Sequence, residues 1–169
     1  MTTHHLAQIN VARMRAPLDS ELMRGFTSQL EAINALADRA PGFVWRLQTP
    51  DGDATSLRVF DDPLMLVNMS VWESLEALHA YVYGGAHLGP MRDRRQWFEK
   101  LETPVLALWW IPAGHVPSVD EGKGKLDELA RLGPTPSAFT FRAAFPPPGE
   151  SHVVAPDVDA EFCSPLPER

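Results

Sequence analysis

The sequence predicts an α+β fold: a ferredoxin-like, split βαβ antiparallel sheet with its helices on one face. Three observations predict this class. Apolar and polar residues alternate over 5–13 and 64–72, as in half-buried strands. After the first of these, apolar residues recur every three or four positions, as in an amphipathic helix. With an apolar run at 105–111, the predicted order is strand, helix, strand, strand, helix, strand.

The first half of the chain contains three predicted strands and one helix. The strand over 5–13 is followed by a helix for which Asp19 is a suitable N-cap. Pro41 and Gly42 end this helix, and 43–48 form the second strand. A long polar connection then leads to the third strand.

The second half begins with a short helix that Ser74 caps and Gly84 terminates. The run at 105–111 is apolar on both faces, which is typical of a central strand. Ser118 and Glu121 form a potential capping box for a last helix, although two glycines weaken its first turns.

Length and composition indicate one domain followed by a tail. The 169 residues suffice for one well-buried core, which we place at 5–145. From 146 to 169 the chain is rich in proline, so this tail is expected to be disordered or loosely draped over the body.

Charge and hydropathy exclude several classes of function. The net charge of −7 argues against a nucleic-acid surface, and no apolar run is long enough to span a membrane. The only cysteine, Cys163, cannot form an internal disulfide, so we expect a cytoplasmic protein.

The two long alternating strands each have one apolar and one polar face. Ala7, Ile9 and Val11, with the odd-numbered apolar residues of 65–71, are expected to meet the helices. The opposite face carries polar and aromatic side chains that would line an enclosed space: Gln8, Asn10, Asn68, Ser70 and Trp72. We expect Asn10 to lie opposite or beside Asn68. A second copy would cover the face without helices, which predicts a homodimer with a small-molecule cleft in each subunit.

Several segments together resemble a bacterial family, domain of unknown function 3291. They are LAQINVARMRAPLDS, PGFVWRL, LVNMSVWESLEAL, the HLxxxRDRRQWFE run and LALWWIPAGHVP, and the resemblance covers about His5 to Phe145. It implies membership of the dimeric α/β-barrel proteins. That group includes cofactor-free antibiotic-biosynthesis monooxygenases, haem-degrading monooxygenases, peroxidase-like enzymes, isomerases and binding proteins.

The resemblance also suggests roles for individual residues. Asn10 occupies a position similar to that of the catalytic Asn of haem-degrading members, and Tyr81 lies roughly where they have a helix Trp. Their essential His has no clear counterpart, because Met91 lies near that position and His87 is displaced. This departure argues against haem degradation.

The asparagines are candidates for stabilising a substrate oxygen. Asn10 and Asn68 could hold a carbonyl or a developing enolate through their N–H donors, or they could satisfy backbone groups at strand ends. Trp72 offers a face for an aromatic ligand, although a core position is the commoner fate of this residue.

His87 follows a Gly–Gly pair and is a candidate general base, or a metal or haem ligand; a capping or surface role is the alternative. Tyr81 and Tyr83 could donate hydrogen bonds to a substrate, but two residues apart on a helix they cannot share one cleft. Trp109 and Trp110 point to opposite faces, so one of them could close the cavity.

Three arginines follow the histidine in the sequence. Arg92, Arg94 and Arg95 could bind a carboxylate through a planar fork, but we expect a solvated helix face paired with Asp93 and Glu99.

The sequence thus favours a small-molecule-binding homodimer that acts as a cofactor-independent, monooxygenase-like enzyme on an aromatic or enolic substrate. The catalytic set would be His87, Asn10, Asn68 and Tyr83, and the substrate-binding set Gln8, Ser70, Trp72, Tyr81 and Trp109. This interpretation needs no metal or cofactor. Two alternatives stay open: a haem protein of the same fold with His87 or another histidine as axial ligand, and a ligand-binding dimer without catalysis.

Overall fold

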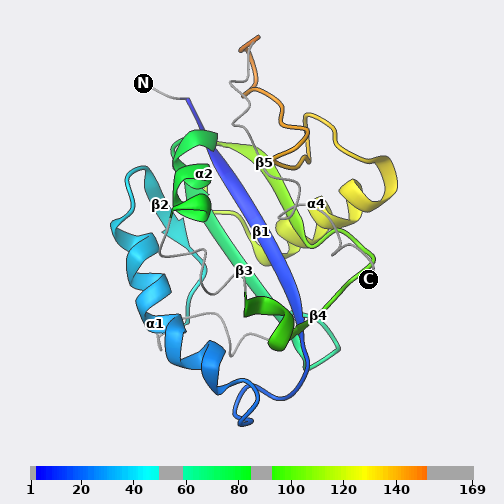
Figure 1. Cartoon of the computed structure of the whole chain (residues 1–169). Helices are drawn as coiled ribbons and strands as arrows, with labels where there is room; N and C mark the ends of the chain where they lie inside the picture. Colours follow the sequence, from blue (N-terminus) through cyan, green and yellow to red (C-terminus); the bar gives the residue numbers. More distant parts are fainter. Residues whose placement is uncertain (1–2, 50–58, 85–92, 152–169) are drawn as a thin grey trace.

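The computed structural model describes residues 3–49, 59–84 and 93–151 (Figure 1). Its elements, in chain order, are β1 (His4–Met14), α1 (Arg24–Arg39), β2 (Phe43–Arg46), β3 (Met65–Trp72), α2 (Leu75–Tyr83), the 3-10 helix η1 (Arg94–Gln96), β4 (Phe98–Glu99), β5 (Leu106–Pro112) and α4 (Val119–Leu132). The predicted tail falls largely outside the described residues, so the domain boundary at 145 stays a prediction.

The sheet is antiparallel throughout, with the order β2-β3-β1 and both β5 and β4 paired to the remaining edge of β1. With α1 between β1 and β2 and α2 between β3 and β5, this confirms the predicted α+β fold and its ferredoxin-like sheet. The strand β5 lies beside β1 but is not central, since among the described residues its far edge carries a single bridge, from Leu108 to Phe139.

Local sequence accounts for where the later helices begin and end. The Ser74 hydroxyl accepts a hydrogen bond from the amide of Ala77 at the start of α2, and Ser118 accepts one from the amide of Glu121 at the start of α4, each at 3.1 Å. These two predicted caps are confirmed. At the end of α4, Gly133 has a φ of 70°, a left-handed conformation that favours glycine.

The pairing of β1 with β3 fixes which side chains share a face. Gln8 lies opposite Ser70. Asn10 lies opposite Asn68, as expected from the sequence. Because side chains alternate along a strand, these residues share one face of the sheet, while Ile9 and Met69 share the other.

Helices cover both faces of this sheet, as the layers in Figure 1 show. The helices α1 and α2 lie over the polar face, where the sequence pattern predicts a second copy. The apolar face packs against α4 through Leu126 and Leu129, and Phe60 packs beside them. The expected pairing of faces and helices is therefore corrected: two helices share one face, as predicted, but it is the polar one.

Close approach of α4 to the sheet depends on Gly122. This glycine is buried, and a Cβ built on it would lie 2.8 Å from Cδ1 of Ile9 and 3.2 Å from Cε of Met69. Gly122, which lowers the helix propensity of this segment, is thus the residue at which α4 contacts the sheet as a third layer.

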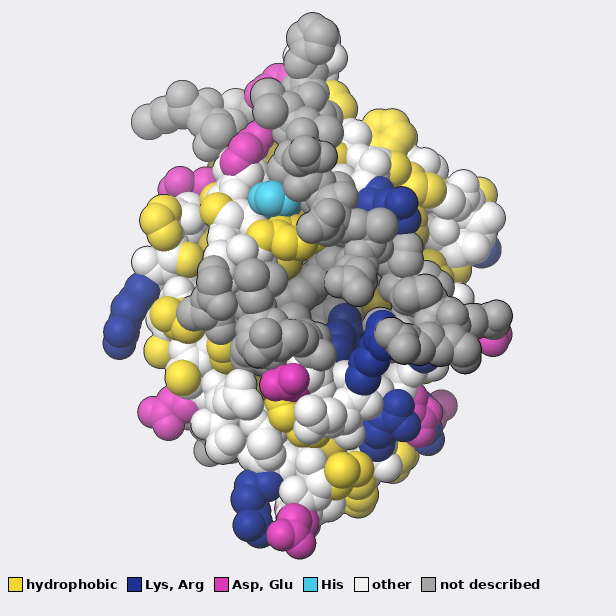
Figure 2. Space-filling model, viewed as in Figure 1, with side chains coloured by type: hydrophobic (Ala, Val, Ile, Leu, Met, Phe, Trp, Pro, Cys, Tyr) yellow, Lys and Arg dark blue, Asp and Glu magenta, His cyan; other side chains and the backbone are white. Residues whose placement is uncertain are grey.

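The face of the molecule seen in Figure 2 is of mixed character. Acidic and basic side chains are interspersed on the face shown in Figure 2, with apolar side chains in small groups between them. In the described part of the chain, no helix is long and apolar enough to cross a membrane.

Candidate small-molecule site

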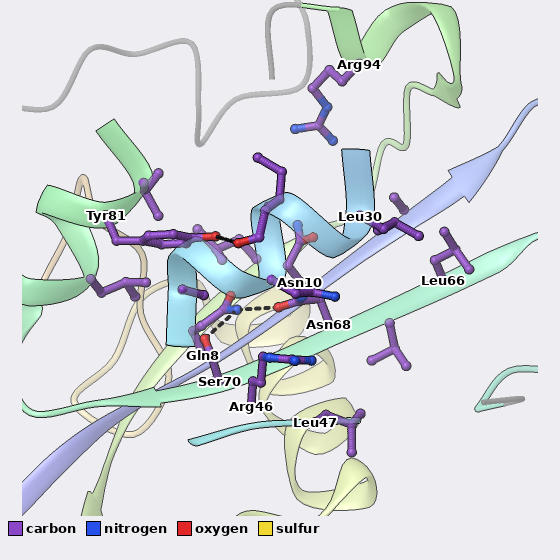
Figure 3. A pocket seen from close by; sticks show the side chains of 18 of the residues that line it. Gln8, Asn10, Leu30, Arg46, Leu47, Leu66, Asn68, Ser70, Tyr81 and Arg94 are labelled. Carbon is purple, nitrogen blue, oxygen red and sulfur yellow. Dashed lines mark hydrogen bonds between the residues drawn. The ribbon is translucent and has the colours of Figure 1, made fainter. Parts of the chain in front are cut away.

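A cavity of about 250 Å³ lies between the polar face of the sheet and helices α1 and α2 (Figure 3). Its volume is just below the range of about 300–1,000 Å³ usual for ligand pockets. The strands contribute Gln8, Asn10, Asn68, Ser70 and Trp72, so all five residues predicted for this face line the cavity. The side chains of α1 that complete the wall include Phe26, Leu30, Ile33 and Asn34.

A hydrogen-bonded group of side chains forms the floor of the cavity (Figure 3). Gln8 Nε2 donates to Asn68 Oδ1 at 2.9 Å and to Ser70 Oγ at 3.1 Å. Trp72 Nε1 donates to the same Ser70 oxygen at 2.8 Å. Since the Asn68 carbonyl oxygen is the acceptor for Gln8, the N–H donors of Asn68 are left for a ligand. Gln8 and Ser70 are buried, whereas Asn68 is exposed.

Asn10 combines the two roles considered for it. It lines the cavity beside Asn68, and its Nδ2 donates to the carbonyl oxygen of Val105 at 3.3 Å. One of its two N–H donors therefore supports the backbone, and the other remains for the cavity.

Two stacked aromatic rings form one wall. The rings of Trp72 and Tyr81 lie 5.0 Å apart with an interplanar angle of 27°. The Tyr81 hydroxyl donates to the carbonyl oxygen of Ile33 at 3.2 Å, and burial raises the pKa of Tyr81 to about 12. Tyr81 is therefore a neutral phenol at physiological pH, suited to packing against a ligand and not to removing a proton.

Two predicted site residues, Tyr83 and Trp109, do not line the cavity in the described structure. Tyr83 lies against His79, with 4.4 Å between the ring centroids, which agrees with the expectation that at most one tyrosine faces the cleft. Trp109 is on the opposite face of the sheet and donates to Glu121, so its assignment to the substrate-binding set is corrected. The other member of that pair, Trp110, donates to the carbonyl oxygen of Phe145 and also does not line the cavity. His87 lies outside the described residues.

Two cationic residues line the cavity although the sequence pattern does not predict Arg46 there and predicts a solvated position for Arg94. Arg46, on β2, forms a two-pronged ion pair with Asp38, with Nε–Oδ1 and Nη2–Oδ2 distances of 2.7 and 3.2 Å. Arg94, on η1, extends into the cavity (Figure 3), where burial lowers its pKa. The only signal for Arg94 in the sequence is the apolar pair Trp97–Phe98 close behind it.

Metal and acid–base groups are scarce in this region. Among the residues that the structure describes, no cluster of three or more His, Cys, Asp or Glu could hold a metal ion. The described lining of the cavity also contains no His, Asp, Glu, Cys or Met. Its chemistry rests on amide and hydroxyl groups, aromatic rings and two guanidinium groups.

Fold and cavity together define an α+β protein with a small-molecule site between sheet and helices. Residues 5–155 match the family model described as "Domain of unknown function (DUF3291)", and the chain belongs to this family, which confirms the resemblance seen in the sequence. No curated protein matches the chain.

Solved structures that resemble this chain include SnoaB, a cofactor-independent oxygenase from Streptomyces nogalater. The two chains are 19% identical with a TM-score of 0.44, and the match covers 66% of this chain and 95% of SnoaB. A dabb family protein with a ferredoxin-like fold from Mesorhizobium loti has 17% identity and a TM-score of 0.40, and 68% and 98% of the two chains are covered. A protein of unknown function from Nitrosomonas europaea has 10% identity and a TM-score of 0.45, with 69% and 97% covered.

Proposed function

We propose that this protein binds an aromatic or enolic small molecule in the cavity between the sheet and helices α1 and α2. The observation that carries the proposal is the position of the Asn10 and Asn68 amides beside the stacked Trp72 and Tyr81 rings. The rings suit the flat apolar part of such a ligand, and the amide donors suit its carbonyl or enolate oxygen.

The same arrangement favours a reaction that passes through an enolate. The N–H donors of Asn68, held by the bond from Gln8 to its carbonyl oxygen, would stabilise an anionic oxygen more than a neutral one. We therefore propose cofactor-independent oxygenation as the activity. The enolate reacts with dioxygen at its α-carbon, and a CH₂ group becomes C=O with release of one water.

Proton removal is the step for which the described cavity provides no base. Tyr81 is neutral, because burial raises its pKa to about 12, and the two arginines are proton donors. The substrate would thus be acidic enough to ionise in the presence of the amide donors, or His87 would supply the base from outside the described residues.

Binding can be tested with 2-naphthol, an aromatic hydroxyl compound, by calorimetry or tryptophan fluorescence. At a pH above the pKa of 2-naphthol, where the probe is the naphtholate anion, we expect Asn68→Asp, which keeps the size of the side chain but replaces its N–H donors with a carboxylate, to weaken binding by about tenfold or more. Ala130→Asp adds the same charge at an exposed position on α4 and should leave the affinity unchanged. Equal affinities of wild type and Asn68→Asp would refute the role of the amide.

Turnover can be tested with anthrone, an aromatic ketone that enolises. One dioxygen should be consumed for each anthraquinone and water formed, without added metal or flavin, and faster than in the protein-free control. Asn68→Asp should abolish the acceleration, and His87→Ala should reduce it if His87 is the base. Binding of 2-naphthol without any acceleration on anthrone or other enolic ketones would favour the alternative, a ligand-binding protein without catalysis.

The haem alternative has little support in the described cavity. An axial ligand is normally a His, Cys, Met or Tyr side chain, and of these the described lining offers only Tyr81, whose hydroxyl is bonded to Ile33. A Soret band that persists after gel filtration of the haem-treated protein would revive this alternative.

The homodimer and the cytoplasmic location remain predictions. A second copy was expected to cover a sheet face without helices, but α1 and α2 lie over the polar face and α4 packs on the apolar face. Sedimentation velocity over a range of concentrations would establish the oligomeric state directly.

A further inference from the structure

The two cationic side chains of the cavity differ in how their charge is balanced. The guanidinium of Arg46 is paired in two-pronged fashion with Asp38. No carboxylate within residues 3–49, 59–84 and 93–151 forms an ion pair with Arg94. Within the part of the chain that the structure describes, Arg94 therefore presents to the cavity a positive charge that no carboxylate balances.

The surroundings of Arg94 raise the energetic cost of its positive charge. The cavity wall near it is apolar and includes Phe26, Trp97 and Phe98. Burial lowers the pKa of Arg94, but a guanidinium remains protonated at neutral pH. A partly desolvated cation without a counter-ion is unfavourable, so an anion that enters the cavity would offset this cost.

The segment that carries Arg94 is fixed before any ligand arrives. The backbone amide of Arg15 donates to the carbonyl oxygen of Trp97 at 2.8 Å, and Arg15 Nε donates to the carbonyl oxygen of Arg95 at 2.9 Å. Trp97 in turn packs against Gly25 at the start of α1, where an added Cβ would lie 3.0 Å from the indole. These contacts hold η1 against β1 and α1, so that a ligand need not order the backbone that carries Arg94.

We infer that the ligand of this cavity carries a carboxylate, which pairs with Arg94 while its aromatic part lies against Trp72 and Tyr81. Figure 3 shows Arg94 extending toward the side-chain amides of Asn10 and Asn68, on a different side of the cavity from Tyr81. A planar carboxylate matches the fork of one guanidinium. A phosphate dianion would need a second free cation, and Arg46 is already neutralised by Asp38. The inference rests on the proposed function, because it specifies the substrate class of the same cavity.

The test compares three probes: 2-naphthol, 6-hydroxy-2-naphthoate and 2-naphthyl phosphate. The first two differ only by the carboxylate. We expect the wild type to prefer the naphthoate over 2-naphthol by about tenfold or more, and this preference to decline with added salt.

Substitution of Arg94 should remove the preference. In Arg94→Gln the ratio of the two affinities is expected to fall to about one, and Arg94→Lys, which keeps the charge but not the fork, should retain an intermediate ratio. The matched control is Arg95→Gln, since Arg95 is the exposed neighbour on η1 and should leave the ratio unchanged.

The outcomes separate this inference from the proposed function. If 2-naphthol binds but the carboxylate adds no affinity, or if Arg95→Gln lowers the ratio as much as Arg94→Gln, the carboxylate subsite is refuted and the cavity is not. Tighter binding of the naphthyl phosphate than of the naphthoate also refutes the carboxylate. If none of the probes binds, the proposed function and this inference are both overturned.

Discussion

Two glycines on α4 provide a direct test of the three-layer arrangement. Gly122 is buried against the sheet, and a Cβ there would lie 2.8 Å from Ile9 and 3.2 Å from Met69. Gly124, two residues later in the same helix, is exposed and has nothing within 4 Å of an added Cβ. Alanine at either position improves helix propensity equally, so any difference between the variants reports the contact with the sheet.

We expect Gly124→Ala to stabilise the protein by about 1 kcal/mol, the usual difference between glycine and alanine inside a helix. In Gly122→Ala the same gain is opposed by overpacking, which costs about 1–3 kcal/mol. The second variant should therefore be unchanged in stability or destabilised by up to about 2 kcal/mol. For a chain of this size, 1 kcal/mol corresponds to about 2–4 °C in melting temperature.

Urea unfolding monitored by tryptophan fluorescence measures both variants against the wild type. Equal slopes of the free energy of unfolding against urea concentration would show that only stability has changed. Equal stabilisation by the two substitutions would refute the close packing of α4 on the apolar face.

Three further predictions concern individual polar groups. Ser70→Ala leaves two buried N–H donors without their acceptor and should cost about 1–3 kcal/mol, whereas the exposed Ser28→Ala should change stability by less than about 0.5 kcal/mol. A small loss in Ser70→Ala would contradict the hydrogen-bonded floor of the cavity. Burial acts to raise the pKa of Glu121, but hydrogen bonds from His115 and Trp109 outweigh it and hold the pKa below the ordinary 4.5. The contribution of Glu121 to stability should thus be present above pH 4.5 and be lost as the pH falls further. The free energies of unfolding of wild type and Glu121→Gln should therefore converge in acid. A difference in urea unfolding that does not depend on pH would argue against this coupling. Tyr81 should ionise at about 12, so the free energy of unfolding should decrease as the pH rises above 10. The ionisation can be followed by the ultraviolet absorbance of the phenolate, and Tyr81→Phe should remove this absorbance change. Ionisation of Tyr81 near 10 in the folded protein would contradict its burial.

The sequence was informative where a local pattern determines the structure. Alternation along β1 and β3 identified the residues of the cavity floor, and the serines before α2 and α4 identified the caps. Both are effects of neighbours along the chain, which a single sequence contains.

What covers each sheet face could not be predicted, because alternation separates two faces without assigning an element to either. Gly122 illustrates this limit. In the sequence it is only a poor helix former, and its role in the close approach of α4 to the sheet is seen only when Ile9 lies opposite it. The same holds for Arg94 and Arg95, which are alike in sequence but lie on different sides of η1, one in the cavity and one in solvent.

The register of β1 against β3 has a consequence for how the protein matures. If one strand slipped by one residue against the other, its asparagine would turn toward α4 and its apolar neighbour, Ile9 or Met69, would enter the cavity. The site therefore cannot exist in a chain whose strands are mispaired. Occupancy by a ligand would select the correctly paired chain from a mixed population and slow its loss to proteolysis, so that in the cell the abundance of the protein would rise with the supply of its ligand.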